Sequence, residues 1–344
     1  MRELIIRESG NEVYDFVSKY VDVNDPDTLI VATTTAFNIE RQLQTTFKAI
    51  INLRRINDIR YINKFFEVVN SKLNNGDIFI SNAETYTLRK KRILKKYPPV
   101  LNWMYYTVDF FFKRVMPKVC CLKKIYFFIT RGNNRVISKA ETLGRLYSCG
   151  FEVMEEKTIQ GQLFFVVKKI KEPAFDYNPT YGPLIKLKRY GKGGKIIKVY
   201  KMRTMHAYSE YLQDYVYKHN QLQEGGKFKD DFRITTVGRI FRKLWIDELP
   251  MFINVLKGEM KIVGIRPLST HYFNLYDKDL RERRKNYKPG LVPPFYADLP
   301  KTLEEIMESE KKYMDAYDKH PLRTDWVYFW KAFHNIVFKH ARSN

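Results

Sequence analysis

Cysteine is scarce in this chain of 344 residues, and no long apolar run is present. Three cysteines, Cys120, Cys121 and Cys149, are too few and too oddly spaced for a disulfide framework or a CxxC metal site, and they suit a reducing compartment. No apolar run reaches roughly 18 residues, so we expect no ordinary transmembrane helix. The first residues carry acids and no apolar core, so we expect no secretory signal.

Acidic residues are also few relative to basic ones. The chain has 61 Lys and Arg against 38 Asp and Glu, which leaves a formal charge of +23. Such a surface attracts polyanions, whether nucleic acid, anionic lipid or phosphate-bearing substrates, and charge alone does not choose among them. The aromatic content of 15% suits both a nucleic-acid surface and a membrane interface. The length suggests about two domains.

Glycine is missing from a stretch where one class of enzyme would need it. Residues 1–170 alternate strand-like and helical segments, which predicts an α/β domain that resembles the back half of a class I methyltransferase. The expected elements are a strand at 28–35, a helix at 56–73, a turn at Asn75-Gly76 before a strand at 78–81, a helix at 138–149 with a Ser138–Glu141 capping box, and a hairpin at 151–169 turning at Gln160-Gly161. Between Gly10 and Gly76 no glycine is available for a cofactor-binding turn, so we expect this Rossmann-like domain to be degenerate and inactive.

One segment of this first domain has membrane-like composition. Residues 97–129 contain a helical stretch that is apolar on nearly every face, broken by Asn102 and Asp109, with Lys and Arg beside it. Rings and amines of this kind suit the lipid headgroup layer, so we predict interfacial insertion. Burial of this helix against the domain core is the alternative. Residues 171–182, with two prolines and a glycine, are predicted to be a linker.

The second half, residues 183–344, begins with two strand-like runs, 183–190 and 195–202. Gly191, Gly193 and Gly194 lie between them and predict a hairpin turn rather than a phosphate loop, because no GK[ST] follows. A polar helical stretch is expected at 207–223, and helices at 301–344 are expected either to lie at an interface or to dock on this domain.

An acidic pair in this half stands at a predicted helix start. The next helix is expected at 248–257, with one apolar face; its members are Leu249, Phe252, Ile253 and Leu256. Asp247 is the predicted N-cap, Pro250 lies in the first turn and Gly258 ends the helix. The positive end of the helix would keep Asp247 ionised and attract phosphate. Arginines nearby complete a site suited to Mg²⁺-assisted phosphoryl chemistry, although an Asp-Glu pair is also ordinary helix capping.

Longer segments of this half resemble a known family. They are GPLIKLKRYGKGGKIIKVYKMRTM (182–205), RITTVGRIFRKLWIDELPMFINVLKGEMKIVGIRP (233–267) and YKPGL (287–291). In order and spacing they are similar to the bacterial sugar transferases, the monotopic polyprenyl-phosphate phosphoglycosyl transferases. The resemblance implies an α+β catalytic domain with interfacial helices. It also implies an enzyme that moves a sugar-1-phosphate from a nucleotide diphospho-sugar, with UDP the expected nucleotide, to polyprenyl phosphate.

The resemblance also assigns roles. Asp247 would be the nucleophile that carries the sugar phosphate, and Glu248 a Mg²⁺ ligand or base; both would contact the metal. Phosphate ligands would be Lys201, Arg203, Arg239, Arg242 and Arg266, and Glu259 would support the site. The expected location is the cytoplasmic face of the bacterial inner membrane, and the expected role is to initiate the synthesis of exopolysaccharide, capsule, O-antigen or another glycoconjugate.

The chain departs from the family pattern in three places. Residues 151–181 are a hairpin and polar linker where the family has a re-entrant membrane helix, so residues 97–129 are predicted to replace it. The box PGLVPPFYADLP (289–300) and the box GIRP both differ from the family's form. The alternatives are an inactive scaffold of a polysaccharide assembly complex, an active methyltransferase, and a nucleic-acid-binding protein; for the last of these no motif is present, and we expect no nucleic-acid partner. The sugar, the polymer and the oligomeric state stay open.

Overall fold

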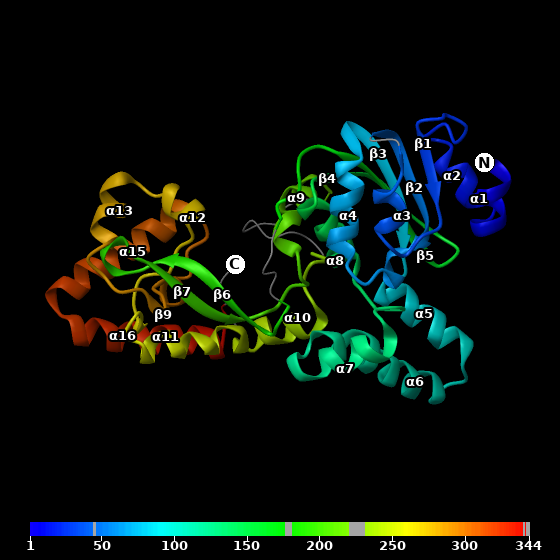
Figure 1. Ribbon diagram of the computed structural model, residues 1–344. Helices are drawn as coiled ribbons and strands as arrows, with labels where there is room; N and C mark the ends of the chain where they lie inside the picture. Colours follow the sequence, from blue (N-terminus) through cyan, green and yellow to red (C-terminus); the bar gives the residue numbers. More distant parts are fainter. Residues whose placement is uncertain (44–45, 176–180, 220–230, 340, 342–344) are drawn as a thin grey trace. The chain divides into compact units, whose positions relative to one another are not determined.

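The computed structural model describes residues 1–43, 46–175, 181–219, 231–339 and 341, which form two compact units. Unit 1 contains Met1–Tyr181 and His206–Tyr215, and unit 2 contains Gly182–Met205 and Val216–Asn344. The chain therefore passes between the units three times. Residues 176–180 of the predicted linker lie outside the described residues. Figure 1 shows the elements of each unit.

Unit 1 is built on one mixed sheet, as the sequence predicts for an α/β domain. Its strands are β1 (Thr28–Val31), β2 (Phe47–Arg55), β3 (Leu73–Ala83), β4 (Phe151–Ile159) and β5 (Gln162–Lys169), in the order β1-β2-β3-β5-β4. The first three are parallel, and β5 is antiparallel to β3 and β4. Central strands of this kind are buried on both faces, which explains the unbroken apolar run Ala49–Ile51 in β2.

Helices surround this sheet (Figure 1). They are α1 (Arg2–Ser9), α2 (Asn11–Val17), α3 (Phe37–Glu40), α4 (Ile62–Ser71), α5 (Tyr86–Lys96), α6 (Leu101–Phe110), α7 (Cys120–Thr130) and α8 (Lys139–Ser148). The predicted helix at 56–73 appears as a short 3₁₀ turn, Ile56–Asp58, followed by α4. Its predicted apolar positions are all buried; they are Ile59, Ile62, Phe66 and Val69.

Two local predictions in unit 1 need correction. Asn75-Gly76 does not form a turn before a strand. Both residues lie inside β3, and Gly76 has φ 96° where the register with β2 shifts. The pair is therefore an irregularity within one long strand. The capping box is half formed. The Ser138 hydroxyl accepts from the Glu141 amide at 3.0 Å, but the Glu141 carboxylate binds Arg114, Lys118 and Arg145 instead of the backbone.

Both predicted hairpins are present. In unit 1, β4 and β5 turn at Gln160 and Gly161, which have φ values of 49° and 76°. Two consecutive residues with positive φ suit the twist of a tight hairpin. In unit 2, β6 (Leu184–Tyr190) pairs with β7 (Ile196–Met202) across the glycine turn.

Unit 2 packs helices around this hairpin and a second, small sheet. The second sheet pairs β8 (Lys261–Val263) in parallel with β9 (Gly290–Val292). The helices are α9 (Gln213–His219), α10 (Thr236–Lys243), α11 (Phe252–Leu256), α12 (Thr270–Asn274), α13 (Lys278–Arg284), α14 (Phe295–Asp298), α15 (Leu303–Lys319) and α16 (Pro321–Val337), although the first residues of α9 belong to unit 1. Val199, Met260, Leu291, Tyr313 and Met314 lie in its core.

No helix in the described parts of the chain is long and apolar enough to cross a bilayer. The predicted polar helix at 207–223 is present as a 3₁₀ turn, Ser209–Leu212, and α9, while its end lies outside the described residues.

Candidate functional site

The acidic pair lies in the first turn of a 3₁₀ helix, Ile246–Met251, that continues into α11. The prediction that Asp247 is the N-cap is wrong: Trp245, in the left-handed region at φ 61°, precedes the helix. Pro250 has no N–H to donate to the carbonyl four residues earlier, which favours the tighter first turn. Gly258 follows the helix at φ 69°, where glycine is favoured.

The helix faces the other way from the sequence prediction. Its core-facing row is Glu248, Met251 and Asn254, exposed by 5, 2 and 0%. The predicted apolar face is on the surface instead; Leu249, Phe252, Ile253 and Leu256 are 38 to 88% exposed. A spacing rule finds such a stripe but does not identify what covers it. This helix thus buries the Glu248 carboxylate and exposes its apolar side chains to the surface.

Partners hold the Glu248 carboxylate on both oxygens. The Lys201 ammonium, from β7, donates to Oε1 at 2.6 Å, and the Tyr296 hydroxyl, from α14, donates to Oε2 at 3.3 Å. The Trp245 indole donates to the same tyrosine hydroxyl at 3.1 Å. The sequence analysis did not identify Tyr296, and its one signal was its place in the altered PGL box.

Asp247 has a different electrostatic environment. Burial and the neighbouring Glu248 carboxylate raise its pKa, and the nearby cations Lys201 and Arg242 only partly oppose this. Burial and Glu248 thus shift the pKa of Asp247 in the direction opposite to that expected from a helix N-terminus, and the ionised state of this carboxylate stays a prediction. When such a half-buried carboxylate next to a second one is ionised, its charge is poorly solvated and therefore reactive.

Arg242 reaches the site because α10 packs closely on the end of β7. The Arg242 Nε donates to the Thr204 hydroxyl at 2.9 Å. Thr235 caps α10, and its amide donates to the Thr204 carbonyl at 2.9 Å. A Cβ on Gly238 would lie 2.0 Å from that carbonyl oxygen, so only glycine permits this approach. The RTM and VGR segments are therefore neighbours in space.

Two predicted phosphate ligands make contacts away from the acidic pair, and a third is exposed. The Arg203 Nε donates to the Gly182 carbonyl at 3.0 Å, and Arg239 lies exposed on α10. The Arg266 guanidinium lies 5.5 Å from the centre of the Phe295 ring. Their role toward phosphate stays a prediction.

Glu259 acts on the site through a residue that the sequence analysis missed. The buried Asn254 amide donates to Glu259 Oε2 at 2.6 Å and to the Lys198 carbonyl at 2.9 Å. Its oxygen accepts from the Tyr200 amide at 3.0 Å. Asn254 therefore fixes the helix of the acidic pair to β7, the strand that carries Lys201, and Glu259 orients the Asn254 amide.

The donor set suits magnesium better than a transition metal. Among the described residues there is no cluster of three or more His, Cys, Asp or Glu side chains that could hold an ion alone. Mg²⁺ is commonly held by one or two carboxylates together with substrate phosphates and water. Asp247 and Glu248 supply such oxygens, and a cation there would relieve the repulsion that raises the pKa of Asp247.

Known proteins are similar to this chain over a region that contains most of unit 2. Residues 175–339 match the family model described as bacterial sugar transferase. The galactosyl transferase CpsE of Streptococcus agalactiae is 42% identical over 106 residues, which cover 30% of this chain and 23% of that protein. A UDP-glucose:undecaprenyl-phosphate glucose-1-phosphate transferase of Caulobacter vibrioides is 40% identical over 114 residues, 32% of this chain and 39% of that one. The alignments span less than half the length of these relatives.

Solved structures add little. An O-methyltransferase family protein from Burkholderia thailandensis aligns with 40% of this chain at 13% identity, with a TM-score of 0.23. That score carries no argument, and the methyltransferase-like character of residues 1–170 stays a prediction.

Proposed function

The chain belongs to the bacterial sugar transferase family through its residues 175–339, and from that premise we propose a phosphoglycosyl transferase. It transfers a sugar-1-phosphate from a nucleotide diphospho-sugar, most simply a UDP-sugar, to polyprenyl phosphate such as undecaprenyl phosphate. The products are UMP and a polyprenyl-diphospho-sugar. Names of the relatives, which include undecaprenyl-phosphate sugar phosphotransferases, support this choice of acceptor.

The proposed reaction has two displacements at one phosphorus atom. The ionised Asp247 carboxylate attacks the β-phosphorus, a new O–P bond forms, and the bond to the UMP oxygen breaks. A phosphate oxygen of the polyprenyl acceptor then attacks the same phosphorus and displaces the carboxylate. Splitting one transfer into two in-line steps is the usual advantage of covalent catalysis.

The single observation that carries the proposal is the half-buried position of Asp247, directly beside the Glu248 carboxylate that Lys201 holds. Its pKa is raised by burial and by Glu248, so the ionised form is a less stabilised and more basic oxygen nucleophile. Lys201, fixed on Glu248 at 2.6 Å, and Arg242 lie close enough to interact with phosphate oxygens that arrive at Asp247. Mg²⁺ held by Asp247 and Glu248 would neutralise diphosphate charge.

A lipid acceptor is consistent with the surface around the site. Exposed apolar side chains of α10, α11 and α16 belong to the unit that carries Asp247, and these helices follow one side of it in Figure 1. Members include Val237, Ile240, Leu244, Phe252, Leu256, Trp326, Trp330 and Phe333. The C-terminal helix docks on this unit, because Phe329 and Ile336 pack on its core, while Trp326, Trp330 and Phe333 stay exposed and suit the proposed lipid contact. The proposed location is the cytoplasmic face of the inner membrane, at the start of polysaccharide synthesis.

The test is a labelled-sugar assay with purified protein, UDP-sugars, Mg²⁺ and polyprenyl phosphate. We expect label in the organic extract and, without the acceptor, a sugar-phosphate adduct on the peptide that contains Asp247. Asp247→Asn should lower turnover by about a thousandfold or more, since the attacking oxygen is lost. The matched control is Asp279→Asn, an exposed acid on α13, which should keep full activity.

Two results would reject the mechanism. The first is normal turnover by Asp247→Asn. The second is label transfer without any adduct under conditions that trap the intermediate in a parallel family member. Absence of transfer with every sugar tried would favour the inactive scaffold.

A further inference from the structure

Helix α6 of unit 1 has its polar residues inside and its apolar residues outside. Asn102 and Asp109, seven positions apart, are its buried residues. Trp103, Met104 and Val108 are exposed by 53, 62 and 56%. A helix that packs on a water-soluble core has the opposite pattern. The alternative that this segment is buried against the core is therefore wrong for its apolar face.

The exposed apolar surface continues beyond α6. It passes through the π-helical turn Phe111–Val115 and the 3₁₀ turn Met116–Lys118 into α7, which Figure 1 shows at the same end of unit 1. Further exposed members are Val100, Leu101, Phe111, Phe112, Val119, Ile125, Phe128 and Ile129. We call the exposed residues of 100–129 the lipid face. So many exposed apolar side chains on successive turns are typical of an interaction site.

Charge identifies the partner of the lipid face. Residues 86–135 contain thirteen basic residues and one acid, Asp109; Arg89 and Arg114 are buried, and seven of the others are exposed. The Lys90 ammonium lies 4.5 Å from the centre of the Trp103 ring, and Lys96 lies 5.4 Å from that of Tyr97. Amines and amphipathic rings at one level match the headgroup layer of an anionic bilayer.

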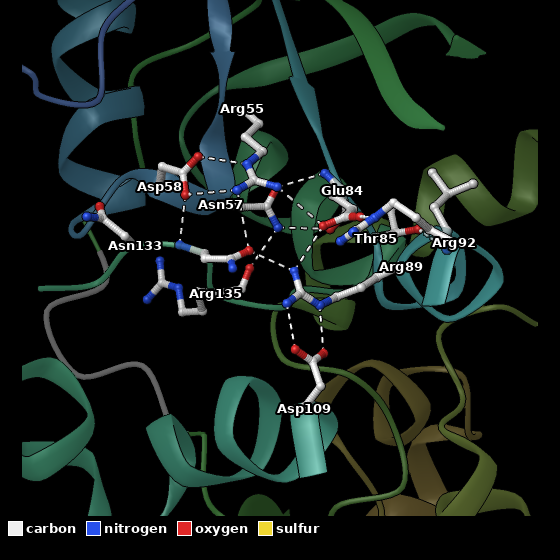
Figure 2. A network of polar contacts seen from close by, with 12 residues as sticks. Arg55, Asn57, Asp58, Glu84, Thr85, Arg89, Arg92, Asp109, Asn133 and Arg135 are labelled. Carbon is white, nitrogen blue, oxygen red and sulfur yellow. Dashed lines mark hydrogen bonds and ion pairs between the residues drawn. The ribbon is translucent and has the colours of Figure 1, made fainter. Parts of the chain in front are cut away.

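The one acid is withdrawn from this surface by a buried network (Figure 2). The Asp109 oxygens accept from Arg89 at 2.6 and 2.7 Å. Arg89 also binds Glu84 at 3.0 Å, just after the end of β3. The network therefore neutralises the acid and fixes the polar side of α6 to the sheet, which leaves the lipid face free of negative charge.

We propose that the lipid face docks unit 1 on the surface of an anionic bilayer. Its aromatic and aliphatic side chains enter the headgroup and upper acyl region without spanning the membrane. This inference does not rest on the proposed transferase activity, because docking is measured without nucleotide sugar or polyprenyl phosphate.

Tryptophan fluorescence in the full chain provides the test. The chain has four tryptophans, and Trp103 is the one in unit 1. A variant with Trp245→Phe, Trp326→Phe and Trp330→Phe reports on Trp103 alone. With phosphatidylglycerol-containing vesicles we expect a blue shift and strong quenching by brominated acyl chains. Circular dichroism confirms that the variant is folded.

The matched control moves the probe. Adding Trp103→Phe and Met154→Trp to that variant places it on β4, where Met154 is 48% exposed outside the lipid face. This probe should not be quenched. Equal quenching of both probes, or no quenching of Trp103 whether or not the protein sediments with vesicles, overturns the proposal. So does the same blue shift with a short RNA in place of vesicles.

A second pair of variants tests the charge. Lys123→Gln with Lys124→Gln, beside Ile125 on α7, should weaken binding to anionic vesicles about 30-fold, at roughly 1 kcal/mol per basic residue. Lys19→Gln with Lys157→Gln makes the same change in net charge at exposed sites off the lipid face and should have little effect. Equal losses in both pairs would indicate general attraction rather than docking.

Discussion

The acidic clusters of the two units have opposite charge balance. In unit 1, burial alone would raise the pKa of the Glu141 carboxyl, but four cations hold it well below the usual range; they are Lys118, Arg114, Arg145 and Arg135. In unit 2, burial and Glu248 raise the pKa of Asp247, and its cations do not compensate. Unit 2 also has a neutralised pair, Arg284 with Glu310, so the contrast lies between sites rather than between units.

This difference separates carboxylates that hold a fold from those suited to chemistry. A buried acid whose charge is fully matched contributes geometry and is inert. An acid left under-compensated beside a second one retains a free-energy cost that a phosphate, a metal or a covalent bond can relieve. The predictions below alter that balance at one site or the other.

The largest expected change in stability comes from Arg89→Met, which breaks the matched network. It leaves Asp109 buried without its bidentate partner and removes one of the cations that contact Glu84, so it should lower the free energy of unfolding of unit 1 by about 3–5 kcal/mol. Urea unfolding followed by Trp103 fluorescence in the single-tryptophan variant measures it. Arg92→Ala is the control; it pairs with Glu84 at 2.6 Å but is 54% exposed, and should cost under about 1 kcal/mol.

Glu248→Gln tests the unmatched site. The amide cannot hold the Lys201 ammonium as an ion pair, and it is a poorer metal ligand, so turnover should fall by about 10²–10³-fold. Steady-state kinetics with UDP-sugar measures this loss. Glu282→Gln, an exposed acid on α13, is the control. Unchanged kcat in Glu248→Gln would remove this residue from the mechanism.

Gly238→Ala should reduce the positive charge that acts on Asp247, because it moves Arg242. The new methyl group would meet the Thr204 carbonyl oxygen at 2.0 Å, so α10 and its Arg242 must move away. Overpacking of this kind costs about 1–3 kcal/mol. Turnover and the melting temperature should both fall. Gly182→Ala, where a Cβ meets nothing within 4 Å, should change neither.

The smallest expected change is a shift in pH dependence. Because attack requires ionised Asp247, the acid limb of kcat/KM should lie above the ordinary range of an aspartate. In the residual activity of Glu248→Gln this limb should move to lower pH, since a negative neighbour is gone. For stability the sign is opposite: a raised pKa favours the fold when Asp247 is protonated, and this contribution is lost as pH rises through that pKa.

Sequence patterns predicted the parts of this molecule that depend on local rules. The hairpin turn at Gln160-Gly161, the Ser138 cap and the buried spacing of Ile62, Phe66 and Val69 all follow from neighbours along the chain. The α/β character of unit 1 followed from the succession of elements. Strand β2 was missed, although its apolar run is clear once its partners are known.

The patterns failed where side chains from distant segments decide the outcome. The Leu249, Phe252, Ile253 and Leu256 stripe reads like a core face, yet Asn254 and Glu248 take the inner positions because β7 offers them hydrogen-bond partners. Nothing local signals that Tyr296 binds Glu248, or that Asp109 is neutralised by Arg89. Nor does the local pattern tell how far burial raises the pKa of Asp247.

The return of the chain into unit 1 at His206–Tyr215 has a consequence for how such a protein can be divided or inherited. A Cβ added to Gly144 would lie 2.3 Å from the Tyr208 carbonyl oxygen, so this segment packs closely on α8. The Tyr208 hydroxyl accepts from the Asn63 amide at 3.0 Å. This excursion starts directly after Met205 of the KMRTM segment. Division of the chain at a single position cannot separate unit 1 from unit 2, because each unit contains two segments of the chain. We therefore expect recombination to keep the two units together in one gene.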